Sequence, residues 1–288
     1  MFIDFSSRPP APGFEGQAPH LSNYRRVYSN SEAQVSRETG PDALRDYLDT
    51  YERLGARAVV LKARDLSSTF GFKIANETVA AFCQAHGPRY VGFAGVDAHQ
   101  GMAAVRELDR AIRELGLRGL NIQGFELGMD IDDRRLYPLY AKCVELDIPV
   151  NIHCGANFST KALMRHGHPQ ALDRVLCDFP ELRVCASPPG WPWVNELIAV
   201  AWRHPNLWIG TLAMRPRLMT TPHSGYEPLL QYGRTILKHR MIFGTAFPMM
   251  PVPRTLDEFS ALPLPDDIRQ KWLCDNAAEF LKLGRPIA

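Results

Sequence analysis

What this sequence lacks narrows its class considerably. Its 33 basic and 31 acidic residues nearly balance, which leaves a formal net charge of +2 and no basic excess of the kind that binds a phosphate backbone. No apolar run approaches the ~20 residues that span a bilayer, and no basic-then-apolar leader opens the chain, so we expect no signal peptide. We therefore expect a soluble protein without nucleic-acid or membrane partners.

The chain also lacks any regular spacing of cysteine. Six cysteines are scattered along 288 residues with no CxxC pair, so neither a disulfide framework nor a zinc knuckle is predicted. They are Cys83, Cys143, Cys154, Cys177, Cys185 and Cys274. Four of them lie in apolar runs, where free cysteine is commonly a small buried hydrophobe. This usage is typical of a reducing compartment, and we expect the protein to be cytoplasmic.

Eight short apolar runs alternate with helix-like segments along the whole chain. The runs are residues 1–5, 58–61, 90–96, 119–122, 149–155, 183–187, 207–211 and 240–245. Alternation of this kind predicts parallel βαβ units, and eight of them favour a closed barrel. The alternative, an open doubly wound sheet, normally carries a glycine-rich phosphate turn after its first strand, and this sequence has none. We predict an α/β fold with a single (β/α)8 TIM-barrel domain over residues 1–288.

The connection after the first run is unusually long. Residues 12–40 are polar and rich in proline near their start, and helical periodicity resumes only after Gly40. Connections of this length in a compact domain are commonly functional. We predict that residues 12–40 form an active-site flap.

The most informative run covers residues 149–155 and ends in His153. In a parallel barrel, strands deliver polar side chains to the carboxyl edge, where active sites are built. A lone histidine is often structural, but one at a strand end suits a general acid or base near neutral pH. His153 is therefore the leading catalytic candidate.

Several segments, in order along the chain, resemble the amidohydrolase-2 branch of the amidohydrolase superfamily. Residues 3–9 (IDFSSRP) look like the family's I-D-x-H-x-H-P strand, and residues 242–249 (IFGTAFPM) look like its G-[ST]-D-[FY]-P segment. Residues 119–140, 149–155, 179–193 and 276–281 are similar to its later strands and closing helix. The family includes metal-dependent decarboxylases and hydrolases of small carboxylated rings. The resemblance implies a TIM barrel and, because such barrels often dimerise, a homodimer.

The chain departs from this family at the metal ligands. The two first-strand histidines fall on Ser6 and Arg8, the sixth-strand histidine on Pro188, and the eighth-strand aspartate on Ala246. Of the polar set that the resemblance implies, His153 remains. A divalent metal needs three or four ligands, and one imidazole cannot hold it.

Cys154 cannot readily complete such a site, because adjacent strand residues point to opposite faces. We therefore predict no catalytic metal and no cofactor.

Arg8 places a fixed cation where the resemblance puts a metal ligand. A guanidinium binds carboxylate with two parallel hydrogen bonds and keeps its charge. We predict that Arg8 clamps a substrate carboxylate or stabilises an oxyanion, with Ser6 beside it as a binding residue. The alternative is a structural ion pair with Asp4 or another acid.

Five further residues are candidates for substrate binding, each with a plainer alternative. Lys62 ends the second strand and could bind an anion or be a solvated lysine. Asn121 and Gln123 alternate at the fourth strand and suit hydrogen bonds to a substrate. Trp191 could wall an aromatic site or pack on the barrel top. Arg215 follows the seventh strand and could add a second cation.

These observations leave three functions open. The first is a metal-independent enzyme acting on a small anionic substrate, a cyclic or aromatic carboxylate, by a lyase, decarboxylase or isomerase step with His153 as acid/base and Arg8 as anion clamp. The second is a metal-independent hydrolase of a lactone or amide. The third is a catalytically silent homologue that acts as a binding partner.

Overall fold

Eight parallel strands form the centre of the molecule. The computed structural model describes residues 1–15, 19–29 and 40–284. The strands are β1 (Phe2–Ser7), β2 (Ala56–Lys62), β5 (Tyr90–Phe93), β6 (Leu120–Ile122), β7 (Val150–Ile152), β8 (Val184–Ala186), β9 (Leu207–Thr211) and β10 (Met241–Phe243). They pair in the orders β1-β2-β5 and β10-β9-β8-β7-β6. Parallel bridges Ala94–Leu120 and Ser7–Phe247 join the two sets, so the sheet closes into a barrel. The predicted TIM barrel is confirmed.

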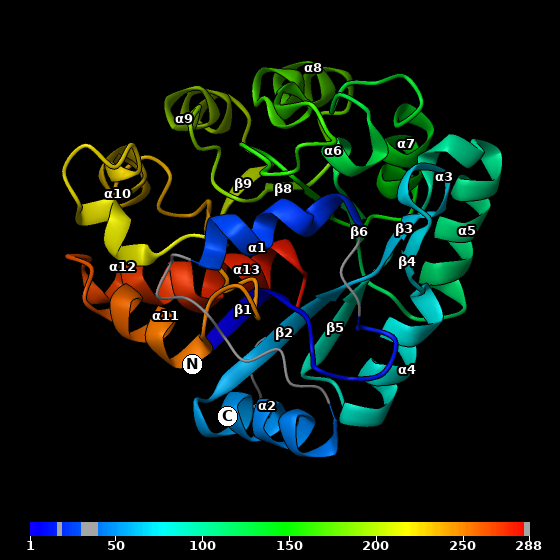
Figure 1. Cartoon of the computed structure of the whole chain (residues 1–288). Helices are drawn as coiled ribbons and strands as arrows, with labels where there is room; N and C mark the ends of the chain where they lie inside the picture. Colours follow the sequence, from blue (N-terminus) through cyan, green and yellow to red (C-terminus); the bar gives the residue numbers. More distant parts are fainter. Residues whose placement is uncertain (16–18, 30–39, 285–288) are drawn as a thin grey trace.

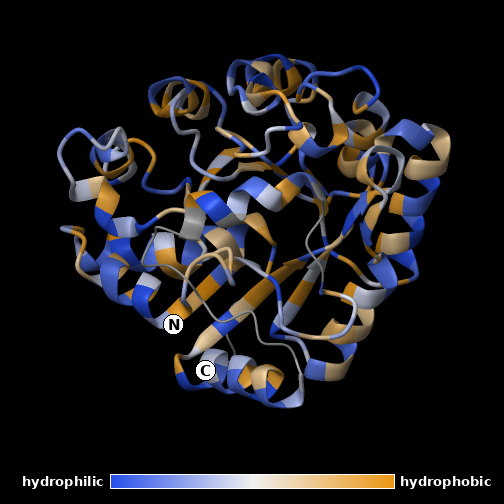
Figure 2. Ribbon diagram, viewed as in Figure 1, coloured by the Kyte–Doolittle hydropathy of each residue, from blue (hydrophilic) through white to orange (hydrophobic). Residues whose placement is uncertain are grey.

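Helices surround the barrel (Figure 1). They are α2 (Pro41–Arg53), α4 (Asn76–His86), α5 (Met102–Arg113), α7 (Tyr137–Glu145), α8 (Gln170–Asp178), α9 (Val194–Arg203), α10 (Glu227–Gly233), α11 (Val252–Ser260) and α12 (Asp266–Gln270). Helix α5 shows why they pack there: it buries Ala104, Val105, Leu108 and Ala111, the i, i+1, i+4, i+7 stripe of an amphipathic helix. Figure 2 shows orange concentrated on the strands, with blue on the outer helix faces.

The apolar side chains of the strands point alternately into two cores, the barrel interior and the layer between the barrel and the surrounding helices. In β2, Ala58 and Val60 belong to the barrel interior, whereas Val59 and Leu61 pack against the surrounding helices. This alternation follows from the two-residue period of a strand.

The interior is closed at one end by helix α13 (Asn276–Phe280). The Phe280 ring lies 5.5 Å from Phe5 and 5.1 Å from Trp208, both interior residues. Its carbonyl accepts a hydrogen bond from Arg183, which immediately precedes β8. Helix α13 therefore covers the amino ends of the strands and leaves the carboxyl ends as the mouth of the barrel.

A register shift in β1 decides which of its residues point to the same side. Asp4 and Ser7 both contact helix α2, through Tyr51 and Tyr47, although three positions separate them. In a regular strand, two residues three positions apart point to opposite faces. Asp4 and Ser7 can point to the same face because β1 has a bulge between them. Because neighbouring strand residues alternate, Ser6 and Arg8, which flank Ser7, are expected on the side of β1 that faces away from α2.

The structure adds elements that the sequence pattern does not reveal. A hairpin of β3 (Arg64–Leu66) and β4 (Phe72–Ile74), bridged by helix α3 (Ser67–Phe70), follows β2. Helix α6 (Gly124–Leu127) follows β6, and helix α11 follows β10. The hairpin strands and helices α3 and α6 span three or four residues each, too few to show a period, whereas α11 spans nine residues. Among the described residues, no helix is long and apolar enough to cross a membrane.

Candidate active site at the barrel mouth

His153 follows β7 directly, and the structure buries it at the mouth, 8% exposed. Its backbone N–H donates to the Ile122 carbonyl at 2.9 Å, which fixes the strand end beside β6. The imidazole packs on Phe125 with ring centroids 4.5 Å apart. Burial, reinforced by the charge of Arg64, lowers the pKa of His153 to about 3, so the ring is neutral near pH 7.

The Nδ1 atom of His153 is buried and accepts or donates no hydrogen bond among the residues that the structure describes. Buried polar atoms without partners are uncommon and often mark a site that a ligand completes. A neutral imidazole with an unpartnered nitrogen can accept a proton.

A chain of polar side chains crosses the strands just below His153. Ser187 Oγ donates to Asn151 Oδ1 at 2.6 Å, Asn151 Nδ2 donates to Asn121 Oδ1 at 2.9 Å, and Asn121 Nδ2 donates to the Ala63 carbonyl at 3.2 Å. Each member is buried and satisfied by the next, which fixes the side chains of three neighbouring strands. Asn121, predicted to bind substrate, is thus part of the wall that supports the site.

Lys62 points into the barrel from the end of β2. Its Nζ lies 4.6 Å from the centre of the Phe5 ring, an interior residue of β1. Burial lowers the pKa of Lys62 to about 8, while Cys185 and Asp4 act in the opposite direction. An ammonium group that titrates this close to neutral pH suits proton transfer as well as anion binding.

A buried ion cluster that the sequence did not predict borders the site. Arg64, at the start of β3, forms an ion pair with Glu126 of α6, with Nε 3.0 Å from Oε2. Glu126 is fully buried, and its other oxygen lies 2.8 Å from His20 Nε2. His20 in turn stacks on Phe70 at 3.9 Å.

The sequence gives one weak indication that Glu126 is buried, because the residue stands between the apolar residues Phe125 and Leu127. Its partners lie 62 and 106 positions away, so no local pattern could identify them.

Arg8 stands at the same mouth, next to this cluster. Its backbone N–H donates to the Phe247 carbonyl at 2.9 Å, which ties the end of β1 to the end of β10. Burial and the Arg8 charge together lower the pKa of Arg64 to about 9, so the two guanidinium groups lie close and both are cationic near pH 7. The sequence left open an ion pair between Arg8 and Asp4. In the structure, the Asp4 carboxylate accepts hydrogen bonds from Thr245, Tyr51 and Ser6.

Helix α1 (Ser22–Ser29) lies across the mouth, in front of the ring of helices (Figure 1). Asn23 Nδ2 donates to the Phe158 carbonyl at 2.8 Å, and Tyr24 Oη accepts from the Phe158 N–H at 3.2 Å. These contacts attach α1 to the loop after β7. Of the predicted flap, residues 12–15, 19–29 and 40 are described, and residues 16–18 and 30–39 lie outside the described residues.

The remaining candidates lie at the rim. Trp191 is 39% exposed, and its carbonyl accepts from the Ala156 N–H at 2.7 Å. Gln123 immediately precedes helix α6. Arg215 forms an ion pair with Glu258 of α11, with Nε 2.9 Å from Oε1, so part of its charge is already balanced.

The family model described as Amidohydrolase matches residues 19–283. The γ-resorcylate decarboxylase of Rhodococcus jostii is 25% identical over 250 residues, which cover 73% of this chain and 76% of that protein. An uncharacterized TIM-barrel protein of Bordetella bronchiseptica is 33% identical, with a TM-score of 0.81 over 98% of both chains.

A dihydroxybenzoic acid decarboxylase of Polaromonas, solved with bound manganese and an inhibitor, superposes with a TM-score of 0.67 over 99% of this chain and 97% of that one. At 16% identity, this likeness shows the fold alone.

The donors at the mouth of this barrel do not fit a divalent cation. A metal of this kind takes three or more imidazole or carboxylate ligands. Glu126 is engaged by Arg64 and His20, and the charge that acts on His153 is the positive charge of Arg64. Ala246, where the resemblance places an aspartate, has no ligand atom in its side chain.

Within residues 1–15, 19–29 and 40–284, the group of three His, Cys, Asp or Glu side chains close enough to share an ion is found elsewhere, between α8 and α9.

Proposed function

The chain belongs to the amidohydrolase family, and from that premise we propose that it is a metal-independent decarboxylase of a small aromatic or cyclic carboxylate. One observation carries the proposal: His153 is buried and neutral at the barrel mouth, with an unpartnered Nδ1, and it lies close to the cation Arg64, which in turn has Arg8 as a neighbour. The γ-resorcylate decarboxylases that this chain resembles support the reaction class.

Arg8 is proposed to bind the substrate carboxylate. Its guanidinium presents two parallel donors to a carboxylate and stays charged throughout the working pH range. Arg64 adds to the positive potential only as far as Glu126 leaves its charge unbalanced, and a positive potential favours anions over neutral rings. Helix α1 above the site would exclude water once the substrate is bound.

His153 is proposed to move one proton. The negative charge of the bound substrate raises the low pKa of His153. The imidazole then accepts the proton of a ring hydroxyl, and the resulting phenolate raises the electron density at the carboxylated ring carbon. The imidazolium then donates that proton to the same carbon, the bond between this carbon and the carboxylate breaks, and its electrons return to the ring as CO2 leaves. The phenolate product recovers a proton from water.

A metal-independent hydrolase of a lactone or amide is the second candidate. The neutral, unpartnered imidazole of His153 is also compatible with this reaction, in which it would take a proton from an attacking water. The two functions differ in product: CO2 in one case, and a ring-opened acid in the other.

The deciding experiment is a product assay on chelator-treated protein. Protein dialysed against EDTA is incubated with hydroxylated benzoates and, separately, with lactones, and CO2 and acid are measured. We expect CO2 release that added Mn2+ or Zn2+ does not increase, lost in His153→Ala and retained in Arg53→Ala, an exposed residue at the end of α2. Activity that needs added metal contradicts metal independence. Turnover that survives His153→Ala contradicts the mechanism, and no turnover of either class supports the catalytically silent alternative.

A further inference from the structure

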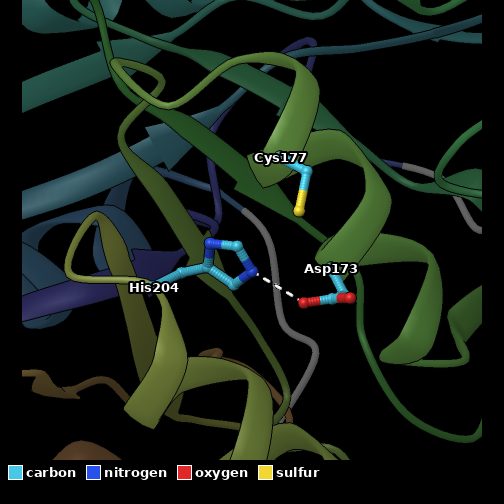
Figure 3. A group of neighbouring side chains, drawn as sticks. All are labelled: Asp173, Cys177 and His204. Atoms are coloured by element: carbon cyan, nitrogen blue, oxygen red, sulfur yellow. Dashed lines mark hydrogen bonds and ion pairs between the residues drawn. The ribbon is translucent and has the colours of Figure 1, made fainter.

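Three ligand-type side chains gather on the outer layer, where α8 meets the end of α9. Asp173 and Cys177 lie one helical turn apart on α8, so both face the same side. His204 directly follows α9, and its Nε2 lies 2.7 Å from Asp173 Oδ1. Figure 3 shows the thiol, imidazole and carboxylate pointing into one common space. The three ligand atoms all lie within 4.8 Å of one another.

The chemistry of this group matches a borderline transition metal. Thiolate sulfur, imidazole nitrogen and carboxylate oxygen are the three ligand types that zinc takes in proteins. Two nitrogen or oxygen ligands at about 2.1 Å from a tetrahedral ion lie about 3.4 Å apart. The hydrogen bond between Asp173 and His204 therefore needs to open by less than an ångström, roughly, to admit the ion.

In the structure, Arg203 supplies the positive charge next to Asp173 and Cys177. Its Nη1 donates to both Asp173 oxygens at 3.0 Å, and its Nη2 lies 3.7 Å from Cys177 Sγ. The Arg203 side chain is 63% exposed, so it can move into solvent at little cost. A cation already attracted to these same donors shows that the cluster favours positive charge.

We propose that Asp173, Cys177 and His204 form a zinc-type metal site that clamps α8 to α9. Three protein ligands leave a fourth position for water, on the side where Cys177 is exposed. His204 lies three residues before β9, at the amino end of the barrel, where residues commonly serve stability. The site does not depend on the proposed function.

Binding has a defined proton balance. The Cys177 thiol loses its proton to become a thiolate ligand, and Nε2 of His204 must offer its lone pair to the ion. One proton is therefore released from the thiol for each ion bound, and affinity rises with pH.

Cobalt titration of the full chain tests the site directly. We expect one Co2+ per chain, with thiolate-to-cobalt charge transfer in the near ultraviolet and intense tetrahedral d–d bands, both displaced by Zn2+. The charge-transfer band reports on Cys177, because the other five cysteines are buried or partly buried. Saturating Zn2+ should also raise the melting temperature.

Variants separate a metal site from a salt-bridge cluster. Cys177→Ser should abolish the charge-transfer band, and His204→Gln should weaken Co2+ binding by more than about tenfold. His239→Gln, an exposed histidine outside the cluster, should bind as the wild type does.

Arg203→Ala, which removes the competing cation, should bind Co2+ more tightly. A wild-type spectrum without charge transfer at one equivalent, or a Cys177→Ser spectrum identical to the wild type, overturns the proposal. So does weaker binding in Arg203→Ala, since it would show that the arginine supports the cluster instead of competing with the ion.

Discussion

Thr245 donates two hydrogen bonds to Asp4, from its backbone N–H to Oδ1 at 2.8 Å and from its hydroxyl to Oδ2 at 2.6 Å. The two residues are 241 positions apart in the sequence, on the first and last barrel strands or their ends. Tyr51 and the Ser6 N–H also donate to the same carboxylate. Asp4 is thus a structural residue that closes the barrel.

Replacing Asp4 by alanine should therefore destabilise the fold strongly. The change leaves several buried donors without an acceptor, and we expect a loss of about 3 kcal/mol in the free energy of unfolding. Thr245→Val, which removes one hydroxyl, should cost about 1–2 kcal/mol. Urea unfolding measures both, and equal losses in the two variants would contradict the central position of Asp4.

His153 should make the protein sensitive to acid. Its pKa is lowered from 6.5 to about 3 in the folded state, so below pH 6.5 the unfolded chain takes up a proton that the folded chain does not. Stability is then lost by up to about 1.4 kcal/mol per pH unit between these values. His153→Asn should lack this component. Between pH 6.5 and pH 4.5, the unfolding free energy of the wild type should fall by about 2–3 kcal/mol more than that of His153→Asn. Equal losses in the two proteins would speak against a buried neutral histidine.

The ion pair between Arg64 and Glu126 should show strong coupling. Glu126→Gln leaves the buried Arg64 charge without its partner, and we expect a loss of about 3–5 kcal/mol. Arg64→Gln in the same protein should restore part of this loss, because no unpaired charge then remains. A double-mutant cycle by chemical denaturation measures the coupling, and additive losses would show that the pair contributes little.

Lys62→Met should stabilise the protein near pH 7 and lower its proposed activity. Burial lowers the Lys62 pKa from 10.5 to about 8, so keeping the folded-state ammonium charged costs up to about 3 kcal/mol, part of which the contact with Phe5 offsets. We expect a net gain of about 1–2 kcal/mol.

The gain should shrink as the pH rises from 8 toward 10.5, because the folded wild type loses the proton first and the cost disappears. Lys62→Arg, which keeps its charge, should be less stable than the wild type throughout. A pH-independent difference between Lys62→Met and the wild type would exclude this explanation.

Arg8→Lys and Arg8→Ala should separate charge from hydrogen-bond geometry in substrate binding. Lysine keeps the positive charge but loses the two parallel donors, so we expect KM for the carboxylate substrate to rise by about tenfold in Arg8→Lys and further in Arg8→Ala. Arg53→Ala is the matched control. Steady-state kinetics measure the effect, and unchanged KM in both variants would remove Arg8 from the substrate site.

The sequence by itself determined the barrel. Its eight apolar runs overlap all eight observed barrel strands, because buried parallel strands need continuous β-branched and apolar residues and the amphipathic helices between them need a 3.6-residue period. It also determined that His153 ends a strand at the barrel mouth. The resemblance predicts that Ser6, Arg8, Pro188 and Ala246 stand where the family has metal ligands.

Tertiary structure alone decided the surroundings of His153. The bulge in β1 that puts Asp4 and Ser7 on the same side of the strand depends on pairing with β2, and Arg64 meets Glu126 across 62 residues. Local periodicity carries no information about such contacts. It indicates which side of a helix or strand is buried, but not which distant charged residue contacts that side. Burial and neighbouring charge, which set the His153 pKa, exist only once the chain has folded.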